Sequence, residues 1–118
     1  MEQSKALEAL SAMAHDTRLD ILRMLVRQGA EGMAAGQIGA QIAAPASRLS
    51  FHLATLERAG LVSSQRVARQ VIYRAEAGRI GAVMGFLLHD CCAAHPAVSA
   101  CCQHASSDAT LTITPPAN

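Results

Sequence analysis

The spacing of apolar residues predicts two amphipathic helices near the N-terminus. The first spans residues 4–13, where leucine or methionine recurs at three-residue steps after a serine. The second begins at Asp16, whose carboxylate can accept hydrogen bonds from the free amides of a first helical turn. It carries a broad apolar face and ends at Gly29. Both helices therefore have one side suited to a core and one side suited to solvent.

A shorter helix and a chain break follow. Ile38 and Ile42 lie one turn apart and predict a helix over residues 35–43. Two glycines inside this segment lower its helix propensity, so tertiary packing has to stabilise it. Pro45 interrupts the chain and can begin the next helix, which continues to Ala59 with a stripe of leucines and is followed by a glycine suited to a left-handed cap.

After this glycine the apolar pattern changes from helical to strand-like. Residues 61–67 and 70–75 are short β-prone runs separated by two residues, which predicts a hairpin. A last helix is predicted from residue 77 to residue 91 or 92. Small residues recur in it every four positions, and this leaves open whether that face contacts a second copy of the chain. The predicted fold is mainly α-helical with a small β-hairpin.

Length and composition exclude several classes of protein. The chain has 118 residues, which suits one domain, and 51% of them are hydrophobic. It contains no apolar run long enough for a transmembrane helix, and its start lacks the layout of a secretory signal. We therefore expect a cytoplasmic protein without a membrane partner. The glycine loop of nucleotide-binding proteins, the zinc-protease helix motif and the serine-hydrolase elbow are also missing, and we expect no enzymatic activity.

Positive charge is concentrated in one segment. The net charge is only +1, which argues against a uniformly basic surface. Residues 45–74, however, carry five basic side chains and one acidic side chain, whereas the segments before and after them are slightly acidic. A local positive segment of this kind is typical of nucleic-acid binding.

Three helices followed by a hairpin form the layout of a winged helix-turn-helix, in which residues 45–59 provide the recognition helix. Small or bidentate side chains near the start of such a helix can reach base edges in the major groove. Arginines in the hairpin can neutralise phosphates. A charged surface that contacts only solvent is the alternative interpretation. The side chains concerned are Ser47, Arg48, Ser50 and His52 in the helix and Arg66, Arg69 and Arg74 in the hairpin.

Three stretches of the chain resemble the ArsR–SmtB family of metal-sensing repressors. Residues 14–22 (AHDTRLDIL) are similar to its second-helix signature, residues 50–62 (SFHLATLERAGLV) to its recognition helix and first strand, and residues 66–73 (RVARQVIY) to its wing. The resemblance implies a winged-helix homodimer that pairs through its first and last helices and binds operator DNA. It implies DNA contacts from Ser47, Arg48, Ser50, Phe51, His52, Arg66, Arg69, Gln70 and Tyr73.

The chain departs from the family pattern at two places. Ala68 stands where the wing turn usually has glycine, which predicts a different type of turn. Residues 35–39, where the founding arsenic and cadmium sensors carry a pair of cysteines, contain none. An effector site therefore has to lie elsewhere in the chain.

The four cysteines form two adjacent pairs, Cys91-Cys92 and Cys101-Cys102, near the C-terminus. In a reducing compartment such a cluster is better suited to metal binding or redox chemistry than to a disulfide framework. The spacing also differs from the C-x2-C pairs of structural zinc sites. Trivalent arsenic takes three thiolates, and this segment resembles that of arsenite-responsive members of the family. The third thiolate is open between Cys101 and Cys102.

We therefore expect a repressor that As(III) releases from its operator, with Sb(III) or methylarsenite as related effectors. Two other sensors remain open: a thiol redox or persulfide sensor, and a divalent-metal sensor that uses His89, His95 or His104 together with thiolates. A thiol enzyme or metal carrier with a cysteine activated beside His95 is a further alternative. Residues 1–92 are expected to form the DNA-binding and dimerisation domain. Residues 93–118 are expected to form a flexible tail, which is rich in Ser, Thr and Pro from residue 105.

Overall fold

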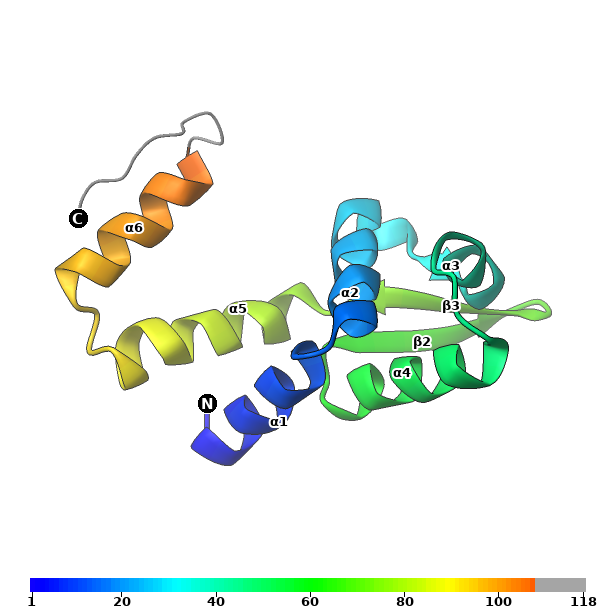
Figure 1. Ribbon diagram of the computed structural model, residues 1–118, viewed down its shortest axis with the longest axis horizontal. Helices are drawn as coiled ribbons and strands as arrows, with labels where there is room; N and C mark the ends of the chain where they lie inside the picture. The colour runs from blue at the N-terminus through cyan, green and yellow to red at the C-terminus, as the bar shows by residue number, and fades with distance from the viewer. Residues whose placement is uncertain (108–118) are drawn as a thin grey trace. The chain divides into compact units, whose positions relative to one another are not determined.

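The computed structural model describes residues 1–107 of the chain (Figure 1). The chain divides into two compact units, Met1–Val83 and Met84–Asn118. No helix of the described part is long and apolar enough to cross a membrane. The helices and strands of the first unit are α1 (Gln3–Met13), α2 (Asp16–Gln28), the 3-10 turn η1 (Gly29–Glu31), β1 (Met33–Ala34), α3 (Ala35–Gln41), α4 (Ala46–Arg58), β2 (Val62–Val67), β3 (Gln70–Ala75) and the start of α5 (Ala77–Gly85).

This order of elements confirms the predicted fold class, a mainly helical winged helix-turn-helix with a β-hairpin wing. In Figure 1 the β2–β3 hairpin extends beyond α3 and α4. The two strands pair antiparallel from Val62 opposite Ala75 to Val67 opposite Gln70. Only two residues, Ala68 and Arg69, connect them.

A third strand, β1, was not predicted from the sequence. Met33 pairs with Tyr73 and Ala34 with Ile72, which gives the sheet order β1-β3-β2. Two residues are too few to show a strand pattern. The preceding Gly32 makes the pairing sterically feasible, because it has φ +70° and a Cβ atom there would lie 2.6 Å from the Tyr73 carbonyl oxygen.

The core of the first unit forms where α1, α2 and α4 pack together and against the sheet. The predicted leucine stripe of α4 is buried, and Ile21, Leu22 and Leu25 of α2 face it. In α1 the expected orientation is confirmed only in part. Its buried side is an alanine stripe, Ala6, Ala9 and Ala12, whereas Leu7 is 56% exposed. Small side chains allow close helix approach, and the larger Leu10 and Met13 are half-buried and pack against this core.

Helix boundaries differ from the predictions at several positions, and the last predicted α-helix, α5, ends at Gly85 rather than at residue 91 or 92. His15 rather than Asp16 caps α2, because its Nδ1 accepts a hydrogen bond from the Thr17 amide at 3.1 Å. α3 ends at Gln41, two residues earlier than expected. The predicted caps at Gly29 and Gly60 are confirmed, with φ +73° and +79°.

The second unit contains a helical segment where a flexible tail was expected. After α5, the chain makes a π-helical turn, η2 (Phe86–Cys91), and α6 (Pro96–Ser107) follows. Residues 92–95 separate them, and two of these four, Ala93 and Ala94, have left-handed backbone. The expected lack of regular structure is therefore wrong for residues 105–107, which belong to α6, whereas the flexibility expected for residues 93–118 stays a prediction. Residues 108–118 lie outside the described part of the chain.

Candidate nucleic-acid interface and the cysteine segment

The helix-turn-helix consists of α3, a short break and α4. The Gln37 side chain accepts a hydrogen bond from the Ala34 amide at 2.9 Å and so fixes the first turn of α3. Gly39 lets α3 approach α4 closely, because a Cβ atom there would lie 3.2 Å from Leu49 Cδ2. Pro45 is the N-cap residue of α4. The turn and the start of the recognition helix are thus set by small residues and one proline.

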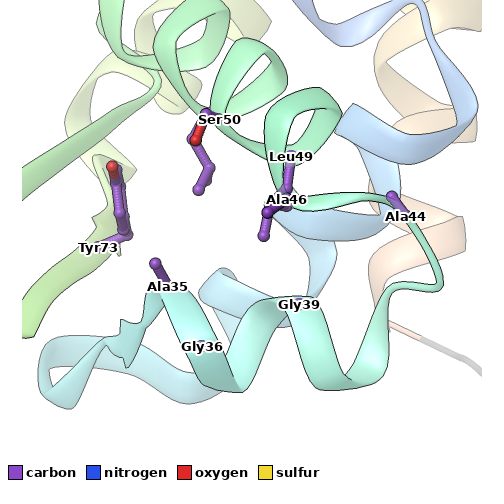
Figure 2. Close-up of a pocket in the computed structure, with 9 residues that line it drawn as sticks. Ala35, Gly36, Gly39, Ala44, Ala46, Leu49, Ser50 and Tyr73 are labelled. Carbon is purple, nitrogen blue, oxygen red and sulfur yellow. The ribbon is translucent and has the colours of Figure 1, made fainter.

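A shallow cavity of about 390 Å³ lies between α3, the start of α4 and β3 (Figure 2). Most of its lining is small or apolar, and the polar groups are the Ser50 hydroxyl and the Tyr73 phenol. Burial raises the pKa of Tyr73, and the nearby Glu57 carboxylate raises it further. The phenol therefore stays protonated at neutral pH. The lining residues are Ala35, Gly36, Gly39, Ala44, Ala46, Leu49, Ser50, Leu53 and Tyr73.

Four of the predicted DNA contacts share the exposed side of α4. All four residues, Ser47, Arg48, Ser50 and Phe51, are exposed, and Phe51 is 60% exposed. They lie opposite the buried leucine stripe. This side combines hydroxyl groups, a guanidinium and one aromatic ring, the types of side chain that reach base edges and phosphates.

His52 does not lie on that side. It is only 3% exposed and packs against α1 and α2, with its ring centroid 4.5 Å from that of His15. Its Nδ1 lies 3.1 Å from Nη1 of Arg18. Burial lowers the pKa of His52, and the positive charges of His15, Arg18 and Arg48 lower it further. The placement of His52 therefore disagrees with a direct DNA contact, because its side chain is inside the fold.

Arg18 was not singled out in the sequence as a functional residue. Its Nε donates to the Ala12 carbonyl at 2.6 Å, in addition to the contact with His52. It lies within the stretch AHDTRLDIL, and a position-specific family motif is the only sequence signal for it. Spacing alone does not distinguish it from the exposed arginines of α2.

The wing exposes Arg66, Arg69 and Gln70 to solvent, so their side chains are accessible, and their contacts with DNA stay a prediction. Arg74 differs from them. Its Nε donates to the Ala30 carbonyl at 2.7 Å and its Nη1 to Gln65 Oε1 at 3.1 Å. This guanidinium ties β3 to η1, so its hydrogen bonds lie within the fold rather than at the wing surface.

The cysteine segment lies in the second unit. Cys91 and Cys101 are exposed and Cys92 is half-buried, all as free thiols. Burial raises the pKa of Cys92, and the adjacent Cys91 raises it further through its charge and a side-chain hydrogen bond. No three His, Cys, Asp or Glu side chains of the described set lie together as metal ligands. The side chains of Cys102 and His104 lie outside that set.

The histidines of this segment are only partly available. His95 Nδ1 accepts a hydrogen bond from the Ala97 amide at 3.1 Å and so occupies the N-terminal end of α6. His89 is exposed on η2. In His95, therefore, Nδ1 is already occupied, and Nε2 is the ring nitrogen that another partner can reach.

Comparison with known proteins gives consistent matches. A family model described as a helix-turn-helix domain matches residues 13–65. The HTH-type transcriptional regulator YgaV of Escherichia coli strain K12 is 37% identical over 91 residues, which cover 77% of this chain and 88% of YgaV. The transcriptional activator HlyU of Vibrio cholerae is 34% identical over 71% of this chain and 75% of HlyU.

Solved structures share the fold. An ArsR-like transcriptional regulator from Rhodococcus sp. RHA1 superposes with a TM-score of 0.68 at 24% identity, covering 86% of this chain and 93% of that protein. The homodimeric winged helix-turn-helix DNA-binding domain of Mb0332 from Mycobacterium bovis, a possible ArsR-family regulator, superposes with a TM-score of 0.59 at 23% identity. This superposition covers 74% of this chain and 84% of the Mb0332 fragment.

Proposed function

This chain belongs to the helix-turn-helix transcriptional regulators, the class of its relatives YgaV and HlyU, and from that premise we propose that it is a homodimeric repressor of the ArsR type, released from its operator by trivalent arsenic. DNA-binding regulation is the common activity of its relatives. The repressor role and the arsenic effector are the new parts of the proposal. The observation that carries them is the pair of adjacent free thiols, Cys91 and Cys92, followed by a second pair nine residues later.

The binding chemistry requires three thiols. In arsenous acid the metalloid carries three hydroxyl groups, and each thiol that binds replaces one of them, so that its proton leaves with the hydroxyl as water. No oxidant or reductant is needed. Cys91 and Cys92 supply two sulfurs from neighbouring positions, and Cys101 or Cys102 supplies the third. A soft thiophilic centre with three-fold geometry suits this set better than zinc, which prefers four ligands.

Effector binding is proposed to change the conformation of the segment after η2. Cys91, Cys92 and Cys101 do not lie together as a three-ligand group in the described structure, so Cys101, where it supplies the third sulfur, has to move toward Cys91 and Cys92. The left-handed residues Ala93 and Ala94 are the hinge we favour, because their backbone conformation is costly for alanine and is readily exchanged for another. A ligand that favours one conformation shifts the population toward it.

The homodimer is proposed to use α1 and α5. Mb0332, which shares the fold, is homodimeric. In this chain α1 buries its alanines and leaves Leu7 exposed, and Met84 of α5 is 45% exposed. In a dimer, two recognition helices can reach successive major grooves of a near-palindromic site. Because binding is reciprocal, operator DNA must then weaken arsenic binding by the same factor as arsenic weakens DNA binding.

Fluorescence anisotropy of labelled operator DNA tests the proposal. Arsenite should release the reduced wild-type protein, and Cys92→Ser should bind the operator with unchanged affinity but stay bound after arsenite is added. The double variant Cys101→Ser/Cys102→Ser should behave in the same way, and His89→Asn is the matched control that should respond normally. Normal release from Cys92→Ser would contradict the arsenic site. Release by peroxide or a persulfide donor, but not by arsenite, would support the redox alternative.

A further inference from the structure

Phe51 is an apolar side chain in a polar setting. Its exposed fraction, 60%, is the highest of any large apolar side chain among the residues whose burial is described. One turn before it on the same helix lie Ser47 and Arg48, both exposed, and one turn after it lies Thr55. Exposure of this apolar ring to water is unfavourable, and contact with another apolar group lowers its free energy.

Contacts within the chain leave the ring of Phe51 uncovered. Its nearest aromatic neighbour, His52, meets it at an edge with ring centroids 5.6 Å apart and is itself buried. The Thr55 hydroxyl donates to the Phe51 backbone carbonyl at 2.9 Å, so this hydroxyl is satisfied within the helix. The accessible part of Phe51 is therefore an aromatic surface beside Arg48 on helix α4.

The major groove of B-DNA offers one prominent apolar group, the C5-methyl of thymine, whereas the other groups that distinguish the base pairs there are hydrogen-bond donors or acceptors. We propose that Phe51 is a specificity-determining residue that recognises this methyl group. The proposal rests on the DNA-binding function of the chain. It assigns to Phe51 a preference for thymine at one position of each half-site, while Arg48 and the serines contact polar groups nearby.

The experiment begins with selection of binding sites from a pool of randomised duplexes by the full-length reduced protein. Each thymine of the selected site is then replaced by uracil, which differs only by lacking the methyl group. In the wild type, uracil at one position per half-site should weaken binding about fourfold, the effect of one buried methyl. For Phe51→Ala the same replacement should have no effect, and Phe51→Met, which keeps an apolar side chain, should retain much of the sensitivity.

A matched control and a converse test complete the design. Val67→Ala removes another exposed apolar side chain, on the wing, and should leave the uracil effect unchanged. Cytosine at the critical position should weaken wild-type binding, and 5-methylcytosine should restore part of it. Equal uracil effects in the wild type and Phe51→Ala at every position would overturn the proposal. A protein that selects no sequence at all would instead contradict the DNA-binding function itself, so the two failures are distinguishable.

Discussion

Arg18 of α2 lies with its Nη1 3.1 Å from Nδ1 of His52 on α4, while its Nε donates to the Ala12 carbonyl of α1 at 2.6 Å. A guanidinium has only donors, so His52 Nδ1 accepts and the proton of the neutral ring lies on Nε2. That Nε2 is buried without a partner in the described structure. One side chain thus links the recognition helix to the two helices beneath it.

Replacing Arg18 should therefore both destabilise the fold and weaken DNA binding. Arg18→Lys keeps the charge but cannot span both acceptors with a planar fork. We expect a loss of about 1–3 kcal/mol in the free energy of unfolding, because a buried acceptor on His52 is left unsatisfied. Urea denaturation measures it. Arg23→Ala is the matched control, since among the described residues Arg23 pairs only with Asp20, at 4.0 Å on the surface, and its loss should change stability by less than about 0.5 kcal/mol.

The same pair predicts a pH dependence. Burial, followed by the charges of His15, Arg18 and Arg48, lowers the pKa of His52 in the folded state. The unfolded chain then binds more protons than the folded chain once the pH falls below about 6.5. Stability should be complete above that pH and decrease as the pH falls toward the lowered pKa of the folded state.

Thermal unfolding between pH 5 and pH 7.5 tests this dependence. His52→Asn keeps an acceptor near Nδ1 but does not titrate, so its stability should fall less between pH 6.5 and pH 5 than that of the wild type. His89→Asn removes an exposed histidine and should retain the wild-type slope. Parallel slopes for all three proteins would assign the acid sensitivity to other groups.

The sequence predicted those features that depend on local pattern. The leucine stripe of α4, the glycine caps and the hairpin follow from spacing and from backbone preferences of single residues. The exposed candidates Ser47, Arg48, Ser50 and Phe51 follow from the same spacing, because they lie opposite the buried leucines.

The features that the sequence did not predict depend on contacts between distant residues. The burial of His52 depends on Arg18, which is 34 positions earlier. β1 forms only because Gly32 allows the backbone to approach Tyr73. In α1, leucine and alanine share the same spacing, and only the closeness of the neighbouring helices determines that alanine faces inward. α6 begins at a proline after two alanines of positive φ, a combination that offers no periodic signal.

The wing turn offers a stabilising substitution. Ala68 has φ +57°, a left-handed conformation that costs an alanine about 1 kcal/mol, and Arg69 beside it does not share it. Ala68→Gly should therefore raise the unfolding free energy by several tenths of a kcal/mol, after the greater flexibility of glycine in the unfolded chain is taken into account. Differential scanning calorimetry measures the effect. Val67→Gly, at a strand position with ordinary backbone, should have the opposite sign.

Two of the three wing arginines, Arg69 and Arg74, should respond differently to removal. Arg69 is exposed and has no hydrogen bond or ion pair in the described structure, so we expect it to contact a phosphate. Arg69→Ala should weaken binding to all DNA sequences alike and reduce the slope of log K against log salt by about one unit, with no change in stability.

Arg74→Ala should keep the salt slope but lower the unfolding free energy by about 1–2 kcal/mol, because the Ala30 carbonyl and Gln65 lose their donor. Anisotropy titrations at four salt concentrations, together with urea denaturation of both variants, separate the two roles. An unchanged salt slope for Arg69→Ala would remove the wing tip from the DNA interface, and a reduced slope for Arg74→Ala would mean that its guanidinium leaves Ala30 when DNA binds.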